Sequence, residues 1–398
     1  MSDPRAHRVA AAARDCGADW ALLTSVDAVA YAAGHVPPIE AGPSPFAGGP
    51  STAIVSADGT VALLCNELER HAADAGWATV VRTYESLGWR EPSPLEDKQA
   101  AAARDLLREL GVGGTVAAQL GTFPLHLRDA LDGGAEIVSI DRALERTRAI
   151  KTAAEVAALR RSAEVTAAGH RAAPGAIRPG HTELAVFADI RLAMETDAGE
   201  RLPVTGDLLS GVQRTAGVMG WPGVRTIGVG DPVICDLAPR VGGYWGDSCN
   251  TLVAGEPTPD FLRLWTTAKR ALGVAAERLR PGITAGDLDG EVRSVIETAG
   301  LSNPLHIGHG IGTSSHEWPR LVPGNPAVIE PGMVLMIEPG AYDPRIGGVR
   351  LEWMFLVTES GNEVLSPFEH VIETTSVGAS ASSAGEIAGQ GGNDDSRQ

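Results

Sequence analysis

The sequence predicts an α+β protein of two domains, a smaller α/β domain followed by a larger domain of helices and antiparallel strands. Three observations predict this class. A chain of 398 residues is long for one hydrophobic core. Helical and strand-like patterns alternate over the first third, whereas helices follow residue 148 and strands dominate after residue 300. The composition, with 43% hydrophobic and 21% charged residues, is globular.

The first domain is expected to span residues 1–147. Its pattern favours the following elements in order: a helix over 5–17, a strand, a turn and a short apolar segment over 21–34, a hairpin over 52–65 that turns at Ala57-Asp58-Gly59, a helix over 95–110 ended by Gly111, and strands near 115–119 and 136–140. Residues 34–50 are too rich in Pro and Gly for regular structure, and they form either a functional loop or a surface excursion.

The second domain is expected to span residues 148–375. A strongly amphipathic helix starts near Thr152, which caps it with Glu155 as the reciprocal partner. Further elements follow in order: helices over 182–198, 259–279 and 284–299, then the β-rich runs VLMIEPG and RLEWMFLVTE. The tail, residues 376–398, is small, polar and aperiodic, and we expect it to be disordered.

Composition excludes several classes of protein. The net charge of −17 and the lack of a Lys/Arg-rich run argue against nucleic-acid binding. Four cysteines without CxxC spacing are typical of a reduced cytoplasmic protein. The N-terminus has no apolar core of a signal peptide, and no stretch approaches a membrane span. We therefore expect a cytoplasmic protein with neither nucleic-acid nor membrane partners.

Five residues in apolar or glycine-rich stretches point to metal binding. Asp236 ends the run PVIC, and Asp247 follows eleven positions later, after a Gly-Gly-Tyr-Trp-Gly turn. If the two segments pair as a hairpin, both carboxylates face one point. Glu338 ends the run MVLMI, Glu352 precedes WMFLV, and His309 lies in GHGIG. One such acid alone is more often a salt-bridged strand end, but five together predict a site.

Four converging carboxylates and one imidazole would need cations. Two divalent metal ions would offset the negative charge, and a bridging hydroxide would complete the site. An oxygen-rich set favours Mn²⁺, Fe²⁺ or Co²⁺ over a thiolate-type zinc site. Mn²⁺ is the ion we expect, with Co²⁺, Fe²⁺ and Zn²⁺ as alternatives.

The segments GDPVICDLAPRVGGYWGDSCNT, GHGIGTSSHEWPRL, PGMVLMIEPGAY and GGVRLEW resemble, in order and spacing, those of the peptidase M24 family, which includes methionine and Xaa-Pro aminopeptidases, prolidase and creatinase. ADWALLTSVDAVAYAAG and RTRAIKTAAEVAALRRSAEV are similar to the creatinase/prolidase-type N-terminal domain and its linker. The resemblance covers nearly the whole chain apart from the tail. It implies a pita-bread catalytic domain, a pseudo-symmetric antiparallel sheet covered by helices.

The resemblance also assigns roles. It implies that Asp236 chelates one metal, that Asp247 and Glu352 bridge both, and that His309 and Glu338 complete the two coordination spheres. Glu338 is similar to the family's proton shuttle. His316 matches a histidine that contacts the substrate carbonyl, and Arg350 is expected to orient the carboxylates. A homodimer, in which the first domain of one subunit walls the partner's site, is implied as well.

One departure from the family pattern is large. Peptidases of the family usually carry a histidine shortly before the ligand strand, and alignment on Pro222 places Met219 there. His306 lies three positions before His309 rather than four, which favours a structural histidine over a displaced substrate contact. Trp221 and Trp353 either line an apolar pocket or pack in the core.

Three hypotheses about function follow. The first is metal-dependent hydrolysis of a C–N amide bond, in a short Xaa-Pro type peptide or in a small amide-like metabolite. The second keeps the fold but changes the chemistry, to hydrolysis of a cyclic or guanidino metabolite or to a lyase reaction, because Met219 replaces the upstream histidine. The third is a non-catalytic binding protein, which would have little reason to keep five metal ligands.

Overall fold

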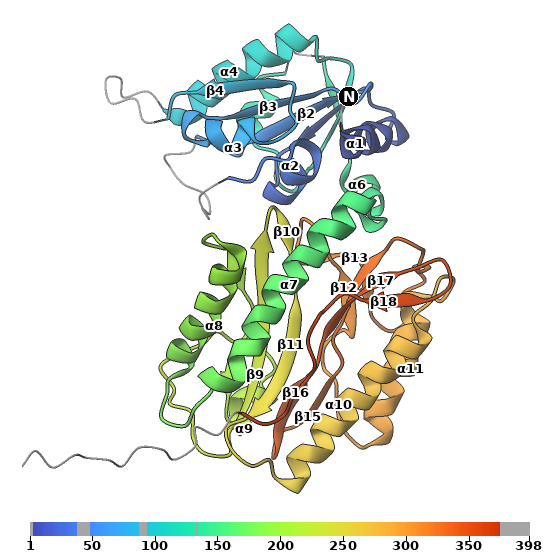
Figure 1. Cartoon of the computed structure of the whole chain (residues 1–398). Helices are drawn as coiled ribbons and strands as arrows, with labels where there is room; N and C mark the ends of the chain where they lie inside the picture. Colours follow the sequence, from blue (N-terminus) through green and yellow to red (C-terminus); the bar gives the residue numbers. More distant parts are fainter. Residues whose placement is uncertain (1–2, 38–47, 87–93, 132–133, 375–398) are drawn as a thin grey trace, which may run out of the picture.

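The computed structural model describes residues 3–37, 48–86, 94–131 and 134–374. The first part of the chain forms one six-stranded sheet with helices packed on it (Figure 1). Its elements are α1 (Pro4–Asp15), β1 (Trp20–Leu23), α2 (Val26–Ala33), β2 (Thr52–Ser56), β3 (Val61–Asn66), the 3₁₀ turn η1 (Glu67–Glu69), α3 (Arg70–Asp74), β4 (Val80–Tyr84), α4 (Leu95–Leu110), β5 (Thr115–Ala118), α5 (Leu125–Arg128), β6 (Glu136–Ser139) and α6 (Asp141–Ala149).

Local sequence explains most of these elements. The strand order is β4-β3-β2-β1-β5-β6, and β2 and β3 form the predicted antiparallel hairpin. Helix α4 ends where expected because Gly111 adopts a positive φ of 70° that stops the helix. The short apolar segment expected after β1 is a helix, α2, because Ser25 caps it by accepting from the Ala28 N–H.

The second part of the chain repeats one succession, a pair of helices followed by antiparallel strands. The first succession is α7 (Ala153–Ala176), α8 (Glu183–Ala198), β7 (Val204–Thr205), β8 (Leu208–Ser210), α9 (Val212–Ala216), β9 (Pro232–Val241), β10 (Tyr244–Trp245) and β11 (Ser248–Val253). The second is α10 (Pro259–Arg278), α11 (Ala285–Thr298), β12 (Gly308–Gly310), β13 (Glu317–Leu321), β14 (Val334–Ile337), β15 (Gly340–Asp343), β16 (Gly347–Arg350), β17 (Trp353–Val357) and β18 (Asn362–Val364).

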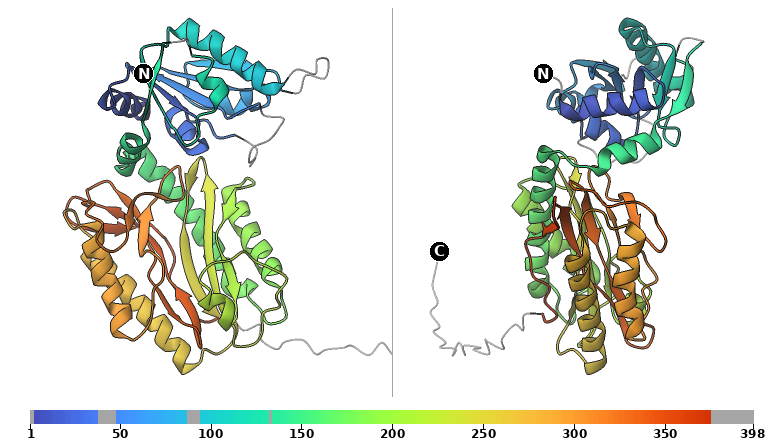
Figure 2. Two further views of the ribbon diagram at one scale, coloured as in Figure 1. Left: turned by 180° about the vertical axis from the view of Figure 1, so that it is seen from behind. Right: turned by 90° about the vertical axis from the view of Figure 1, so that its right-hand side faces the viewer.

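The two halves place their strands side by side. β9 is the centre of the first sheet and pairs with β7, β8, β10 and β11, while the second sheet runs β13-β12-β14-β17-β18. Helices α7 and α8 pack against the first half and α10 and α11 against the second (Figures 1 and 2). This arrangement is the pseudo-symmetric antiparallel sheet with covering helices that the resemblance implies.

A buried charge cluster joins the two parts of the chain. Arg148, 7% exposed, donates to Asp27 on α2 at 2.6 Å and pairs with Glu317 on β13. Lys151 donates to Glu317 at 2.8 Å, and Thr152 and Glu155 form the predicted capping box at the start of α7.

The boundary predicted near residue 148 falls in the last turn of α6, four residues before the cap of α7, Thr152. The predicted disordered tail, 376–398, and most of the 34–50 loop lie outside the described residues.

Candidate metal centre

Strand register brings the predicted ligands together from both halves. Asp236 pairs with Cys249 in the β9–β11 ladder, and Asp247 immediately precedes β11, so the two aspartates lie diagonally on one face. In the other sheet β14 and β17 pair at Ile337 and Trp353, so Glu338 and Glu352 lie opposite each other just beyond the ladder. His309 is the central residue of β12, which pairs with β14.

His309 lies among the carboxylates. Its Nε2 is 3.4 Å from Oε1 of Glu338 and 3.8 Å from Oδ2 of Asp247. Ligand atoms of Asp247, His309 and Glu352 all lie within 4.8 Å of one another, and these three residues are buried. Asp236 and Glu338 lie outside that group, and Oδ2 of Asp236 accepts from Nη2 of Arg350 at 2.6 Å.

The His309 ring is in the state that a metal requires. Its Nδ1 is 2.8 Å from the carbonyl oxygen of Gly310, and because a carbonyl only accepts, Nδ1 carries the proton. Nε2 therefore presents its lone pair to the carboxylates. Burial lowers the pKa of His309 to about 4, which outweighs the attraction of Glu338, so the imidazole is neutral at pH 7.

The carboxylates lack sufficient positive charge in the chain itself. Burial, followed by the charge of neighbouring acids, raises the pKa of Asp236 to about 6 and the pKa values of Asp247 and Glu352 well above their ordinary range. Glu352 Oε2 is buried and has no hydrogen-bond partner among the described residues. An unpartnered buried oxygen and the repulsion between neighbouring carboxylates each cost free energy. Divalent cations bound to the carboxylates would offset both costs.

Two more histidines extend the cluster. His306 Nε2 lies 3.0 Å from Glu338 Oε1, and its Nδ1 accepts from Arg320 Nε at 3.0 Å, so Nε2 carries the proton and donates to Glu338. Burial raises the pKa of Glu338, but this hydrogen bond and the nearby histidines outweigh it and lower the pKa overall. His316 stacks on the His309 ring with centroids 4.0 Å apart. The contact with Glu338 favours a role for His306 in the site over a purely structural one.

Arg350 organises the other side of the site, where the sequence analysis missed a residue. Nη2 of Arg350 binds Asp207 at 2.7 Å as well as Asp236. Asp207 precedes the short strand β8, and a lone acid before three residues of strand gives no signal in the sequence. Only the β8–β9 register places Asp207 beside Asp236.

The aromatic and apolar candidate residues Trp353, Met219 and Trp221 differ in their surroundings. Strand alternation turns Trp353 away from Glu352, and the centroid of its ring lies 4.6 Å from that of His370. These contacts favour core packing over pocket lining for Trp353. Met219 and Trp221 are 69% and 74% exposed and lie on the loop that follows α9.

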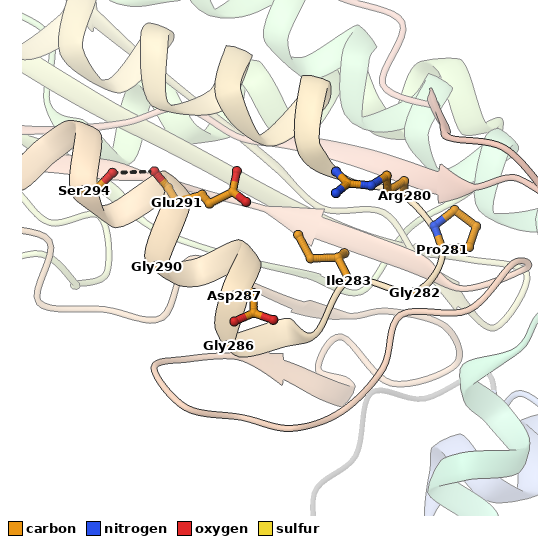
Figure 3. Close-up of a pocket in the computed structure, with 9 residues that line it drawn as sticks. All are labelled: Arg280, Pro281, Gly282, Ile283, Gly286, Asp287, Gly290, Glu291 and Ser294. Carbon is orange, nitrogen blue, oxygen red and sulfur yellow. Dashed lines mark hydrogen bonds between the residues drawn. The ribbon is translucent and has the colours of Figure 1, made fainter.

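A separate surface cavity of about 830 Å³ is lined by the loop between α10 and α11 and by one side of α11 (Figure 3). It shares no residue with the metal centre, and a hydrogen bond from Ser294 Oγ to the Glu291 carbonyl lies along it. Its lining residues are Arg280, Pro281, Gly282, Ile283, Gly286, Asp287, Gly290, Glu291 and Ser294.

Comparisons with known proteins identify the family. Metallopeptidase family M24 matches residues 157–359, and the creatinase/prolidase N-terminal domain matches residues 5–150. The chain therefore belongs to metallopeptidase family M24, and family membership implies divalent metal ions.

Three known proteins that are similar to this chain are named as dipeptidases or as a prolidase. It is 36% identical over 242 residues to the probable dipeptidase PepE of Mycobacterium tuberculosis, covering 60% of this chain and 63% of that protein. It is 33% identical over 236 residues to the Xaa-Pro dipeptidase of Pyrococcus furiosus, covering 59% and 68%. The prolidase structure from Pyrococcus horikoshii OT3 superimposes with a TM-score of 0.77 and 25% identity, over 94% of this chain and 100% of that chain.

The curated matches thus span about two thirds of their relatives' length, while the structural match spans both domains. Among the described residues, no helix combines the length and apolar character that crossing a membrane requires.

Proposed function

We propose that this protein is a metal-dependent hydrolase that cleaves a C–N amide bond in a short peptide of the Xaa-Pro type or in a small amide-like metabolite. One observation carries the proposal: buried carboxylates and a neutral imidazole from both halves of the fold converge, with Glu352 Oε2 left unpartnered. The names of the relatives, dipeptidase and Xaa-Pro dipeptidase, support the choice of substrate class.

In this proposal five residues hold two divalent ions, with Mn²⁺ expected: Asp236, Asp247, His309, Glu338 and Glu352. Bound there, the ions would supply an activated water and polarise the scissile carbonyl. The donor set, four carboxylates and one imidazole, is the oxygen-rich type that Mn²⁺, Fe²⁺ and Co²⁺ prefer.

The chain's own residues would handle the proton and the charge. Glu338, whose pKa is lowered, is ionised at pH 7 and can take a proton from the attacking water and pass it to the leaving nitrogen. The hydrogen bond from His306 fixes the orientation of Glu338. His316, stacked beside His309 on the open side of the cluster, can donate to the oxygen that gains charge.

Met219 supports a second candidate. At the position where peptidases of the family usually carry histidine, a thioether can neither donate a strong hydrogen bond nor act as a base. A hydrolase of a cyclic or guanidino metabolite, or a lyase, would fit that change. A non-catalytic binding protein fits less well, because it would not need the buried charges.

The test is a screen with Mn²⁺-loaded protein. Cleavage of Xaa-Pro dipeptides, lost on chelation and restored by Mn²⁺, is the expected result. Cleavage of cyclic amides or guanidino compounds alone would favour the second candidate. No turnover of either class with any of Mn²⁺, Co²⁺, Fe²⁺ or Zn²⁺ would contradict a hydrolase.

We further propose a homodimer, since the resemblance implies that a partner's first domain walls the site. Multi-angle light scattering at concentrations used for assay should give twice the chain mass of 41.3 kDa. A fully active monomer would contradict this arrangement.

A further inference from the structure

Asp207 lies directly opposite Asp236 on the neighbouring strand. β8 pairs antiparallel with β9, with Leu208 opposite Cys235, and the Asp236 N–H donates to the Asp207 carbonyl at 2.9 Å. Opposed residues of antiparallel strands project from the same face, so the two carboxylates lie together. Both accept from Nη2 of Arg350, at 2.7 Å and 2.6 Å. Asp207 is therefore part of the charged network of the site without being one of the five candidate ligands.

Asp207 and Arg350 also hold the loop around Met219 through hydrogen bonds. Oδ1 of Asp207 accepts the N–H of Gly220 at 3.0 Å. Nη1 of Arg350 donates to the carbonyl of Val218 at 3.1 Å. The two backbone groups flank Met219, so the chain is anchored on both sides of that residue.

We refer to the anchored stretch Val218–Trp221 as the rim segment. Val218 has φ of 78°, a left-handed conformation that a β-branched residue rarely adopts. Its side chain packs against a small buried cluster that includes Leu209, Ile234 and Tyr342. A strained residue that packing and two neighbouring hydrogen bonds hold in place indicates that the position of this backbone matters.

The rim segment presents two large apolar side chains to solvent. Met219 is 69% exposed and Trp221 is 74% exposed. The backbone beside Met219 contacts Arg350, which contacts the candidate ligand Asp236, so the exposed pair lies at the edge of the metal centre. Exposed apolar groups on a fixed backbone beside a reaction centre are suited to bind an apolar part of a ligand.

We propose that the rim segment binds an apolar side chain of the substrate and that Asp207 is the residue that positions it. This inference rests on the proposed function and narrows its substrate to a short peptide or amide with a large apolar group. Asp207 acts through the Gly220 N–H and through Arg350.

The first test compares KM for Leu-Pro and Ala-Pro in Mn²⁺-loaded Met219→Ala and Trp221→Ala. We expect a preference for Leu-Pro in the wild type that falls about tenfold in each variant, as for other lost apolar contacts in binding sites. Leu192→Ala, which removes an apolar side chain 65% exposed on α8, is the matched control and should keep the wild-type preference. An unchanged preference in both rim variants would overturn the proposal.

The second test concerns Asp207→Ala. It should lose the Leu-Pro preference as the rim variants do, retain bound Mn²⁺, and show faster amide exchange at Gly220. Asp231→Ala is the matched control, because Asp231 likewise accepts a glycine N–H, from Gly228 at 2.6 Å, and an arginine, Arg225 at 2.7 Å.

Loss of Mn²⁺ from Asp207→Ala would show that Asp207 serves the metal centre. An unchanged preference for Leu-Pro would show that Asp207 does not position the rim segment. Either result overturns the proposed role of Asp207. If Asp207→Ala fails to fold, Asp207→Leu, which is similar in size and has no hydrogen-bond acceptor, takes its place under the same criteria.

A binding measurement separates failure of this inference from failure of the proposed function. L-leucine and glycine are titrated calorimetrically into Mn²⁺-loaded wild type, Trp221→Ala and Leu192→Ala. Tighter binding of leucine than of glycine, lost only in Trp221→Ala, supports the rim even if no dipeptide is cleaved. Equal leucine affinity in the wild type and Trp221→Ala overturns it even if dipeptides are cleaved.

Discussion

Glu338 is the residue at which the candidate ligands and the histidines meet, since it contacts both His306 and His309. Glu338→Gln keeps the shape of the side chain but removes its capacity to carry a proton. We expect turnover to fall by about 10²–10⁴-fold, the usual contribution of a general base, with the fold retained. The assay is run with excess Mn²⁺, and Glu363→Gln, an exposed acid paired with Arg160, serves as control. A wild-type rate for Glu338→Gln would remove Glu338 from the mechanism.

Substitution of His309 should affect metal binding, whereas substitution of His316 should affect catalysis. His309 is buried with its Nε2 facing Asp247 and Glu338, so His309→Ala should lose retained metal. His316 is exposed and contacts the cluster through its ring, so His316→Ala should keep the metal and lower kcat by about 10²–10³-fold, as when an oxyanion donor is removed. Metal analysis and steady-state kinetics on both variants check this, and equal metal loss in the two would refute the division.

His170 predicts how stability depends on pH. It is buried, stacks on Phe368 and contacts Ser248, and burial lowers its pKa to about 3. Between the ordinary value of about 6.5 and this value, the unfolded chain takes up a proton that the folded protein excludes. The free energy of unfolding is therefore not lowered by His170 above pH 6.5, and it decreases as the pH falls from 6.5 toward 3.

The expected loss from His170 is about 2 kcal/mol between pH 6.5 and pH 5, at roughly 1.4 kcal/mol for each pH unit. Urea unfolding at several pH values should show a shallower pH dependence for His170→Gln than for the wild type. Parallel curves for the two proteins would mean that His170 is protonated in the folded state.

At the scale of elements, strand β13 is tied to the linker between the two parts of the chain. Glu317 is buried, and Arg148 and Lys151 bind it while Arg148 also binds Asp27. Removing one partner of a buried ion pair costs about 3–5 kcal/mol because it leaves buried charge uncompensated. Glu317→Gln should therefore lower the free energy of unfolding by about that amount.

Chemical denaturation of Glu317→Gln measures this effect. Glu291→Gln provides the comparison, because Glu291 pairs with Arg278 at 2.9 Å on the surface, where such pairs contribute about 0–1 kcal/mol. Similar losses in the two variants would show that the linker cluster contributes no more than a surface pair.

Elements with local determinants could be predicted from the sequence. Gly111 marks the end of α4, Thr152 with Glu155 marks the start of α7, and the Ala57–Gly59 turn joins β2 to β3, because each depends on residues within a few positions. Features set by register could not be predicted in this way. Asp207 reaches Asp236 only through the β8–β9 pairing, and Trp353 is turned away only by the alternation of β17.

At the scale of the whole molecule, the candidate site exists because two similar halves meet. Asp236 and Asp247 come from the first sheet, and His309, Glu338 and Glu352 come from the second, so neither half holds the full set. The sequence contains the residue types and their order, which identified the family, but the convergence depends on how the sheets lie side by side (Figure 1). The substrate is decided by loops such as Val218–Trp221, whose shape follows from tertiary contacts.

The most direct test of the five-residue metal centre is elemental analysis of gently purified protein, repeated after loading with Mn²⁺, Co²⁺ or Fe²⁺ and desalting. Close to two metal ions per chain, reduced in Asp247→Asn, is the predicted result. Retention of no metal under any loading condition would contradict the account, because the buried carboxylates and the neutral imidazole of His309 would then have to be stable without cations.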